Sequence, residues 1–230
     1  MIIGTENINK LKRSASVFGI IFFGMLMIAP ISGLFLDVLL TINIIFAIIF
    51  VLKTIYIADD KRFEALPSIL LVTTFLGLSL NLSVVRLILQ GKGSTIFLVD
   101  TIGKSLVGGN YIIGSAVLAV VILIQFMLIM NVTSTIINES ENKKDDFYGA
   151  LNGAGRFVKG KFIADLIFIF INLFAGMAIA VLMRGEVAMR ILPTFISLTI
   201  GASICSQLPF AFYLVASNRL VRRLKIQKYN

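Results

Sequence analysis

Six long apolar runs dominate this sequence of 230 residues, and each approaches the length needed to cross a lipid bilayer. The hydrocarbon core of a bilayer takes about 20 residues of helix, because every backbone group must find its partner within the span. Only 14% of the residues are charged, against about a quarter in soluble domains. We therefore predict an all-α polytopic membrane protein with spans near residues 17–36, 38–57, 66–89, 111–130, 162–183 and 191–215.

One polar stretch, residues 138–161, separates four of these runs from the last two. Its first part is charged and has no apolar pattern. Its second part repeats apolar residues at helical spacing, which indicates either a short amphipathic helix on the cytoplasmic membrane surface or a solvated loop. The apolar stripe consists of Phe147, Leu151, Ala154 and Val158. We divide the chain into segments 1–16 (cytoplasmic), 17–137 (four spans), 138–161 (polar break), 162–217 (two spans) and 218–230 (basic cytoplasmic tail).

The distribution of basic residues predicts how the chain lies in the membrane. If the ends and loops are assigned alternately to two sides, 15 basic residues lie on the side of the termini and the polar break, and four on the other. The positive-inside rule then places both termini and the break in the cytoplasm. The net charge of +9 follows from basic residues that face anionic lipid, so it gives no reason to expect a nucleic-acid partner.

Few side chains in this sequence can carry catalysis or bind a metal. There is no histidine, and Cys205 is the only cysteine. The commonest metal ligand and the usual proton shuttle at neutral pH are therefore missing. We also find no nucleophile–base pair and no phosphate-binding loop, so we expect no catalytic residues, no metal, no cofactor and no enzyme activity.

Several polar residues lie in or beside the apolar runs. Asp37 is expected to cap the second span, and an ion site is the alternative. The span at 66–89 contains Asn81 and is too polar to face lipid all round, so we expect it inside a bundle. Arg86 lies near its end and either reaches toward the interface or takes part in a buried ion pair or a pore. Lys161 and Asp165 have the spacing of an ion pair at an interface.

Several longer motifs resemble a known family. LLVTT at 70–74, RLIL at 86–89, VGGNY at 107–111 and DFYGA at 146–150 occur in order, and LFLDVLLTINI precedes them. Together they resemble the membrane domain of the FlhA-like family, the large export-gate components of flagellar and virulence type III secretion systems. The resemblance runs from about the first span to the last.

The sequence also departs from the pattern of that family. The family has an arginine where Gly77 stands, an aspartate where Asn152 and Lys161 stand, a small residue where Asp165 stands, and Gly-Asp-Gly where residues 201–203 read Gly-Ala-Ser. Its members also carry a longer insert between the fourth and fifth spans. They continue past the sixth span into a cytoplasmic domain that receives substrates. We therefore expect a truncated and divergent member with few acidic groups for ion coupling.

Three functional hypotheses follow. The resemblance implies a subunit of the bacterial cytoplasmic membrane that joins other export-apparatus proteins, in a ring of like subunits, with Arg86, Asn152 and the helix at 147–158 as contact or gate elements. The first alternative is an independent ion-conducting or ion-coupled transporter, in which Asp37, Arg86, Lys161 and Asp165 converge on one path. The second alternative is a degenerate or accessory paralogue without export activity.

Overall fold

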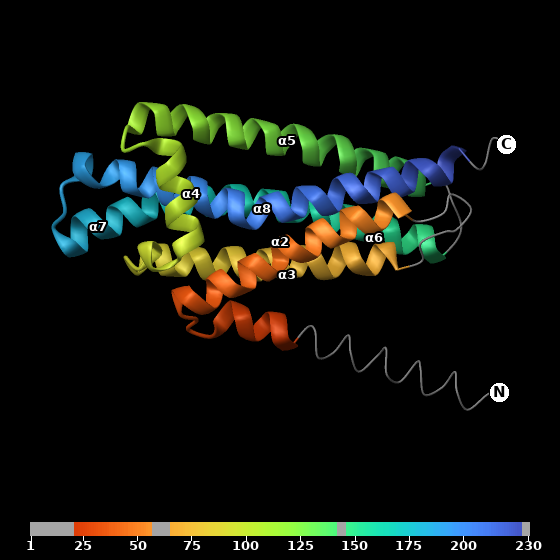
Figure 1. Cartoon of the computed structure of the whole chain (residues 1–230), viewed down its shortest axis with the longest axis horizontal. Coiled ribbons are helices and arrows are strands. Elements are labelled where there is room, and N and C mark those ends of the chain that lie inside the picture. Colours follow the sequence, from red (N-terminus) through yellow and green to blue (C-terminus); the bar gives the residue numbers. More distant parts are fainter. Residues whose placement is uncertain (1–20, 57–64, 142–145, 227–230) are drawn as a thin grey trace.

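The computed structural model describes residues 21–56, 65–141 and 146–226, and helices make up nearly all of this part. Five described helical stretches are long and apolar enough to cross a membrane. The chain is therefore an all-α polytopic membrane protein. Its elements, shown in Figure 1, are α2 (Gly33–Tyr56), α3 (Leu66–Leu89), η1 (Gly93–Thr95), α4 (Phe97–Val107), α5 (Tyr111–Glu141), α6 (Asp146–Phe170), η2 (Ile171–Ala175), α7 (Gly176–Arg184) and α8 (Ala188–Ile226).

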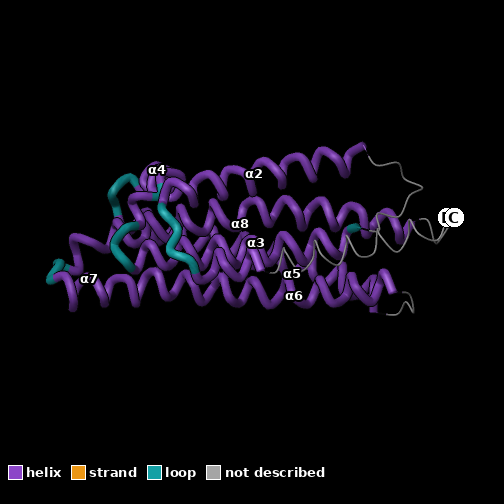
Figure 2. The backbone as a smooth tube through the Cα atoms, turned by 90° about the horizontal axis from the view of Figure 1, so that it is seen from below, coloured by secondary structure: helices purple, strands orange, loops and turns teal. Residues whose placement is uncertain are grey.

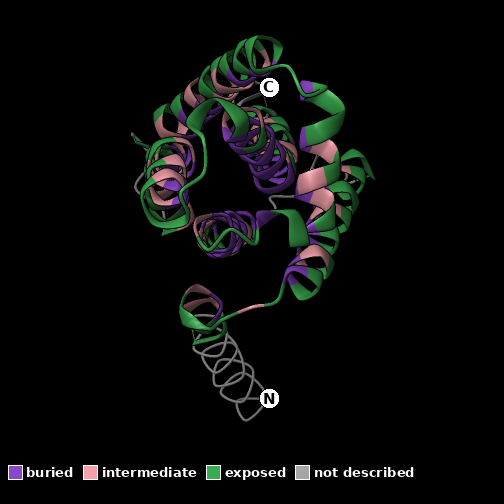
Figure 3. Ribbon diagram, turned by 90° about the vertical axis from the view of Figure 1, so that its left-hand side faces the viewer, coloured by how far each residue is buried: buried purple, intermediate pink, exposed green. Residues whose placement is uncertain are grey.

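Helix α8 forms the centre of the bundle. It contacts α2, α3, α4 and α5 along its length. In its apolar 18-residue stretch 72% is buried, whereas in the corresponding stretch of α5 only 17% is buried. Figure 3, viewed along the bundle, shows a mostly buried helix inside a ring of helices with exposed outer faces. Serine and threonine side chains on α8 donate to carbonyls one turn back, so these polar groups are satisfied inside the bundle.

The segment between the predicted spans at 66–89 and 111–130 contains a helix, α4. Helix α4 crosses the long helices at one end of the bundle and packs on α8 (Figures 1 and 2). A side chain at Gly103 would collide with the backbone of Ser197, and one at Gly201 would collide with that of Val99. The glycines thus allow two helix backbones to approach closely.

The helix of the first predicted span, 17–36, ends earlier than predicted. Residues 21–28 are helical, the chain turns at Pro30, and α2 begins at Gly33. Asp37 therefore lies inside α2 and not in a connection between two spans. The turn is explained by the proline, which cannot continue a helix, and by Ser32, whose hydroxyl accepts the N–H of Phe35 at the start of α2. Residues 17–20 of the predicted span lie outside the described part.

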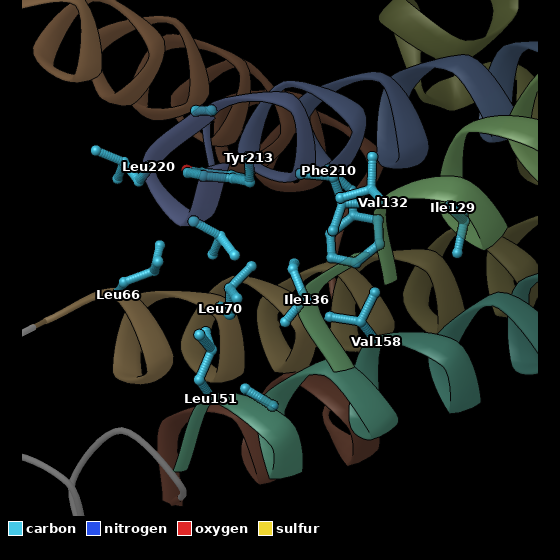
Figure 4. Close-up of a cluster of buried hydrophobic side chains, with 14 of the residues drawn as sticks. Leu66, Leu70, Ile129, Val132, Ile136, Leu151, Val158, Phe210, Tyr213 and Leu220 are labelled. Atoms are coloured by element: carbon cyan, nitrogen blue, oxygen red, sulfur yellow. The ribbon is translucent and has the colours of Figure 1, made fainter. Parts of the chain in front are cut away.

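The polar break is not a separate surface helix. Helix α5 extends through its first part to Glu141, and α6 begins at Asp146 and runs on into the next predicted span. The predicted apolar stripe is real, because Leu151, Ala154 and Val158 are buried and Phe147 packs beside them. Figure 4 shows that this stripe faces side chains of α3, α5 and α8. Other helices of the same chain cover this apolar stripe, so it does not need a membrane surface.

Two more boundaries differ from the prediction. Helix α6 continues through a π-helical turn, η2, into α7, so that residues 146–184 form one long helical stretch. Helix α8 passes without a break through Pro193 and Pro209 and continues into the predicted basic tail. A proline removes one backbone donor, and a helix packed on several sides can tolerate that loss. Helices of this length are longer than the roughly 20 residues that cross a bilayer.

Candidate functional site

The centre of the bundle contains a buried cluster of three polar residues. Asp165 of α6 accepts a hydrogen bond on Oδ2 from Nζ of Lys161, one turn earlier on the same helix. Its other oxygen, Oδ1, accepts the side-chain amide of Asn81 of α3 at 2.9 Å. The ion-pair side chains are 0% and 1% exposed. We call these three residues the charge cluster.

Two further residues shape the space around the lysine. The Lys161 ammonium lies 4.5 Å from the centroid of the Phe210 ring on α8, a distance at which a cation is attracted to the ring face. A Cβ at Gly77 of α3 would lie 2.8 Å from Cε of Lys161. The glycine therefore provides the room in which the lysine stem runs. In this way the charge cluster joins α3, α6 and α8.

The electrostatics of the cluster favour a closed structural arrangement. An isolated charge in such an interior would cost several kcal/mol, but the pair is neutral overall and each carboxylate oxygen has a donor. Elsewhere in the described part, buried side-chain atoms of Asn172 and Gln207 have no hydrogen-bond partner. Asn172 lies two turns beyond Asp165, in the π-helical turn that follows α6. The charge cluster can thus hold helices together. Further along the same helical stretch lies another buried polar group, that of Asn172.

Arg86 lies away from the charge cluster and binds the end of the first helical segment, residues 21–28. It donates from Nη1 to the carbonyls of Ile28 (3.1 Å) and Ala29 (2.5 Å), and from Nη2 to that of Met27. These carbonyls end the helical residues 21–28 and have no partner within that helix. Arg86 therefore caps a neighbouring helix, and it also lines a cavity of about 550 Å³ beside the turn at Pro30.

Asp37 caps a helix as predicted, but a different one. Its carboxylate accepts the backbone N–H groups of Phe97 (2.7 Å) and Leu98 (2.9 Å), which are the first residues of α4. A carboxylate at a helix N-terminus satisfies free donors and complements the helix dipole. Asp37 thus holds α4 onto α2, at the end of the bundle that also contains Arg86.

Asn152 lies near the opposite end, on the surface of α6. Its side-chain oxygen accepts Nε–H of Arg156 at 2.9 Å, and Arg156 lies 3.6 Å from the carboxylate of Glu141 on α5. These exposed groups connect the two arms of the α5–α6 hairpin. Leu151 and its apolar neighbours lie on the other face of α6, within the core.

The structure brings together three of the six predicted site residues and separates the others. Asn81, Lys161 and Asp165 meet, whereas Asp37, Arg86 and Asn152 lie in three other places. Sequence reasoning missed the roles of Gly77 and Phe210. The sequence did contain one indication that Gly77 and Lys161 are related, because both were named as positions at which this chain departs from the pattern of the family that it resembles.

Comparisons of the sequence with known proteins identify the family of this chain. The FHIPEP family matches residues 23–139 and 137–229. The chain is 32% identical over 238 residues to the flagellar biosynthesis protein FlhA of Proteus mirabilis, covering 86% of this chain and 34% of that protein. It is 29% identical over 235 residues to the low calcium response locus protein D of Yersinia pestis (86% and 33%).

A third relative is the secretion system apparatus protein SsaV of Salmonella typhimurium, which is 28% identical over 240 residues (89% of this chain and 35% of that protein). No solved structure matches. The chain spans about a third of the length of these curated relatives. Because the family match covers nearly all of the chain in order, this protein belongs to the FHIPEP family.

Proposed function

We infer that this chain is a membrane subunit of a flagellar or virulence type III protein-export apparatus. The observation that carries the proposal is the match to the FHIPEP family over residues 23–139 and 137–229, which include all five described candidate spans. The relatives include a protein named for flagellar biosynthesis and one named for a secretion-system apparatus. The proposed partners are other membrane proteins of that apparatus and further copies of this chain in a ring.

The geometry supports a packed gate element. The charge cluster fixes α3, α6 and α8 relative to one another, Arg86 holds the first helical segment, and Asp37 holds α4. In our proposal, a subunit joined in this way forms part of the wall of an export gate. Asn152 and the exposed face of the α5–α6 hairpin then form a contact surface for the apparatus.

In this proposal the chain lies in the bacterial cytoplasmic membrane with both termini in the cytoplasm. The basic residues that flank the spans concentrate on the side of the termini. Figure 1 shows that the C-terminal end of α8, the end of α5 and the start of α6 lie at one end of the bundle, with α4 toward the other. The charged connection, residues 142–145, is thus assigned to the cytoplasm.

A native pull-down tests this function. The tagged chain is extracted from its own host in mild detergent, and the product is analysed by mass spectrometry and by particle size. We expect other export-apparatus proteins to co-purify in a large particle. A tagged, unrelated polytopic protein of similar size serves as the control. A chain that emerges alone, or with the same proteins as the control, would contradict the proposal.

An ion-coupled transporter is the second candidate, because the core contains the pair Lys161 and Asp165 together with unpartnered buried polar atoms of Asn172 and Gln207. The separation of Asp37 and Arg86 from this pair weighs against the single path that the sequence suggested. Ion flux into liposomes that contain only this chain distinguishes the two candidates. Flux that Asp165→Asn abolishes would favour the transporter.

A further inference from the structure

An apolar groove runs along the outside of the bundle between α2 and α3. It encloses about 580 Å³. Its walls include Phe46 and Ile49 of α2 and Val72 and Leu76 of α3, and Tyr213 of α8 also lines it. Phe46, Ile49 and Val72 are each about half exposed. Both helices that form the groove are candidate membrane spans, so the medium that reaches it is lipid.

The lining of the groove changes from polar to apolar along the bundle axis. Lys53 and Ser68 lie where α2 ends and α3 begins, and toward the middle of the helices the lining side chains are apolar except for Thr73. On α3 the lining runs from Ser68 to Leu76, which corresponds to about 12 Å of helix, and Ala65 extends it just beyond the start of that helix. One leaflet of the hydrocarbon core is about 15 Å deep. The groove therefore fits within the depth of a single leaflet.

Among the described residues that line the groove, one is charged, and it is basic. Lys53 lies in the last turn of α2 and is exposed, and none of the described residues that line the groove is acidic. Within the described part of the chain it forms no ion pair. A phospholipid has the complementary order of groups, with an anionic phosphate at the interface and an apolar tail below it.

We propose that the α2–α3 groove binds an anionic glycerophospholipid, whose tail lies along Phe46 and Val72 and whose phosphate lies at Lys53. The lipid comes from the leaflet at the end of the bundle where α2 ends. This proposal does not depend on the export function. It requires only that α2 and α3 cross a bilayer.

Native mass spectrometry of the purified chain, titrated with phosphatidylglycerol or phosphatidylcholine, tests the proposal. We expect the wild-type chain to bind phosphatidylglycerol more tightly. Lys53→Gln should reduce that preference about fivefold, because a basic residue near a membrane surface contributes about that factor. Lys159→Gln, which removes an exposed lysine outside the groove, should leave the preference unchanged.

A second pair of variants tests the tail. Val72→Trp fills the groove and should remove the tightest bound lipid of either class, whereas Ile124→Trp on the exposed face of α5 should not. In the wild-type chain, a lipid with a photoreactive acyl chain should label peptides that contain Phe46 or Val72. This measurement does not depend on whether a variant folds. Equal binding by both tryptophan variants, labelling elsewhere, or a dimer that only Val72→Trp disrupts would each overturn the proposal.

Discussion

The charge cluster shows that single positions in this core depend on one another. Lys161 occupies the space beside Gly77, and Asp165 balances its charge. The resemblance noted in the sequence implies a basic residue at the position of Gly77 and an acidic residue at that of Lys161. Here the cation lies on α6 and the glycine on α3. In this chain the core beside the interface between α3 and α6 contains one buried opposite-charge pair.

Removing one member of the pair should be more harmful than removing both. Lys161→Met leaves the Asp165 carboxylate buried without its cation, and Asp165→Leu leaves the ammonium unpaired, so each should lower the free energy of unfolding by about 3–5 kcal/mol. The double variant should lie closer to the wild type than either single variant. Unfolding of the purified protein by added SDS measures this.

The surface pair Lys104 and Asp100 provides the matched control, with side chains 66% and 18% exposed. Its removal by Lys104→Met should change the unfolding midpoint very little. If the losses from Lys161→Met and Asp165→Leu simply add in the double variant, the two side chains do not depend on each other and the interpretation is wrong.

At the scale of elements, the sequence was informative where a pattern is local. The long apolar runs predicted most of the spans, and the spacing from Phe147 to Val158 predicted an apolar helical face. The partner of that face depends on side chains of α3, α5 and α8, which lie far away in the sequence. For the same reason the sequence did not reveal α4, since its N-terminal cap, Asp37, comes from another helix.

Asp37 should control the stability of α4. In Asp37→Ala the N–H groups of Phe97 and Leu98 lose their acceptor, which should cost about 0.5–2 kcal/mol and speed amide exchange in the first turn of α4. Asp37→Asn retains an oxygen and should have a smaller effect. Hydrogen–deuterium exchange of peptides from α4 is the measurement.

Asp100→Ala, in the same helix, serves as the control because it removes a carboxylate that pairs with Lys104 near the surface. It should leave exchange in the first turn of α4 closer to the wild-type rate. Equal acceleration in Asp37→Ala and Asp100→Ala would mean that the loss of negative charge near the helix, and not the cap, determines the exchange rate.

At the scale of the molecule, the structure has two distinct ends. One end contains the cap between Asp37 and α4 and the cap between Arg86 and the first helical segment. The other contains the α5–α6 hairpin with Asn152 (Figures 1 and 2). The charge cluster lies between them. The distribution of basic residues then determines which end faces the cytoplasm.

A labelling experiment tests this orientation. Cys205 is the only cysteine and is 1% exposed, so the wild-type chain should react with a membrane-impermeant maleimide only weakly. Lys104→Cys places a thiol on exposed α4, and Asp146→Cys places one at the exposed start of α6. We expect Lys104→Cys to be labelled in intact cells and Asp146→Cys only after the membrane is opened. The reverse pattern would place the termini outside the cytoplasm, and labelling of both thiols in intact cells would show that the two ends of the bundle do not lie on opposite sides of the membrane.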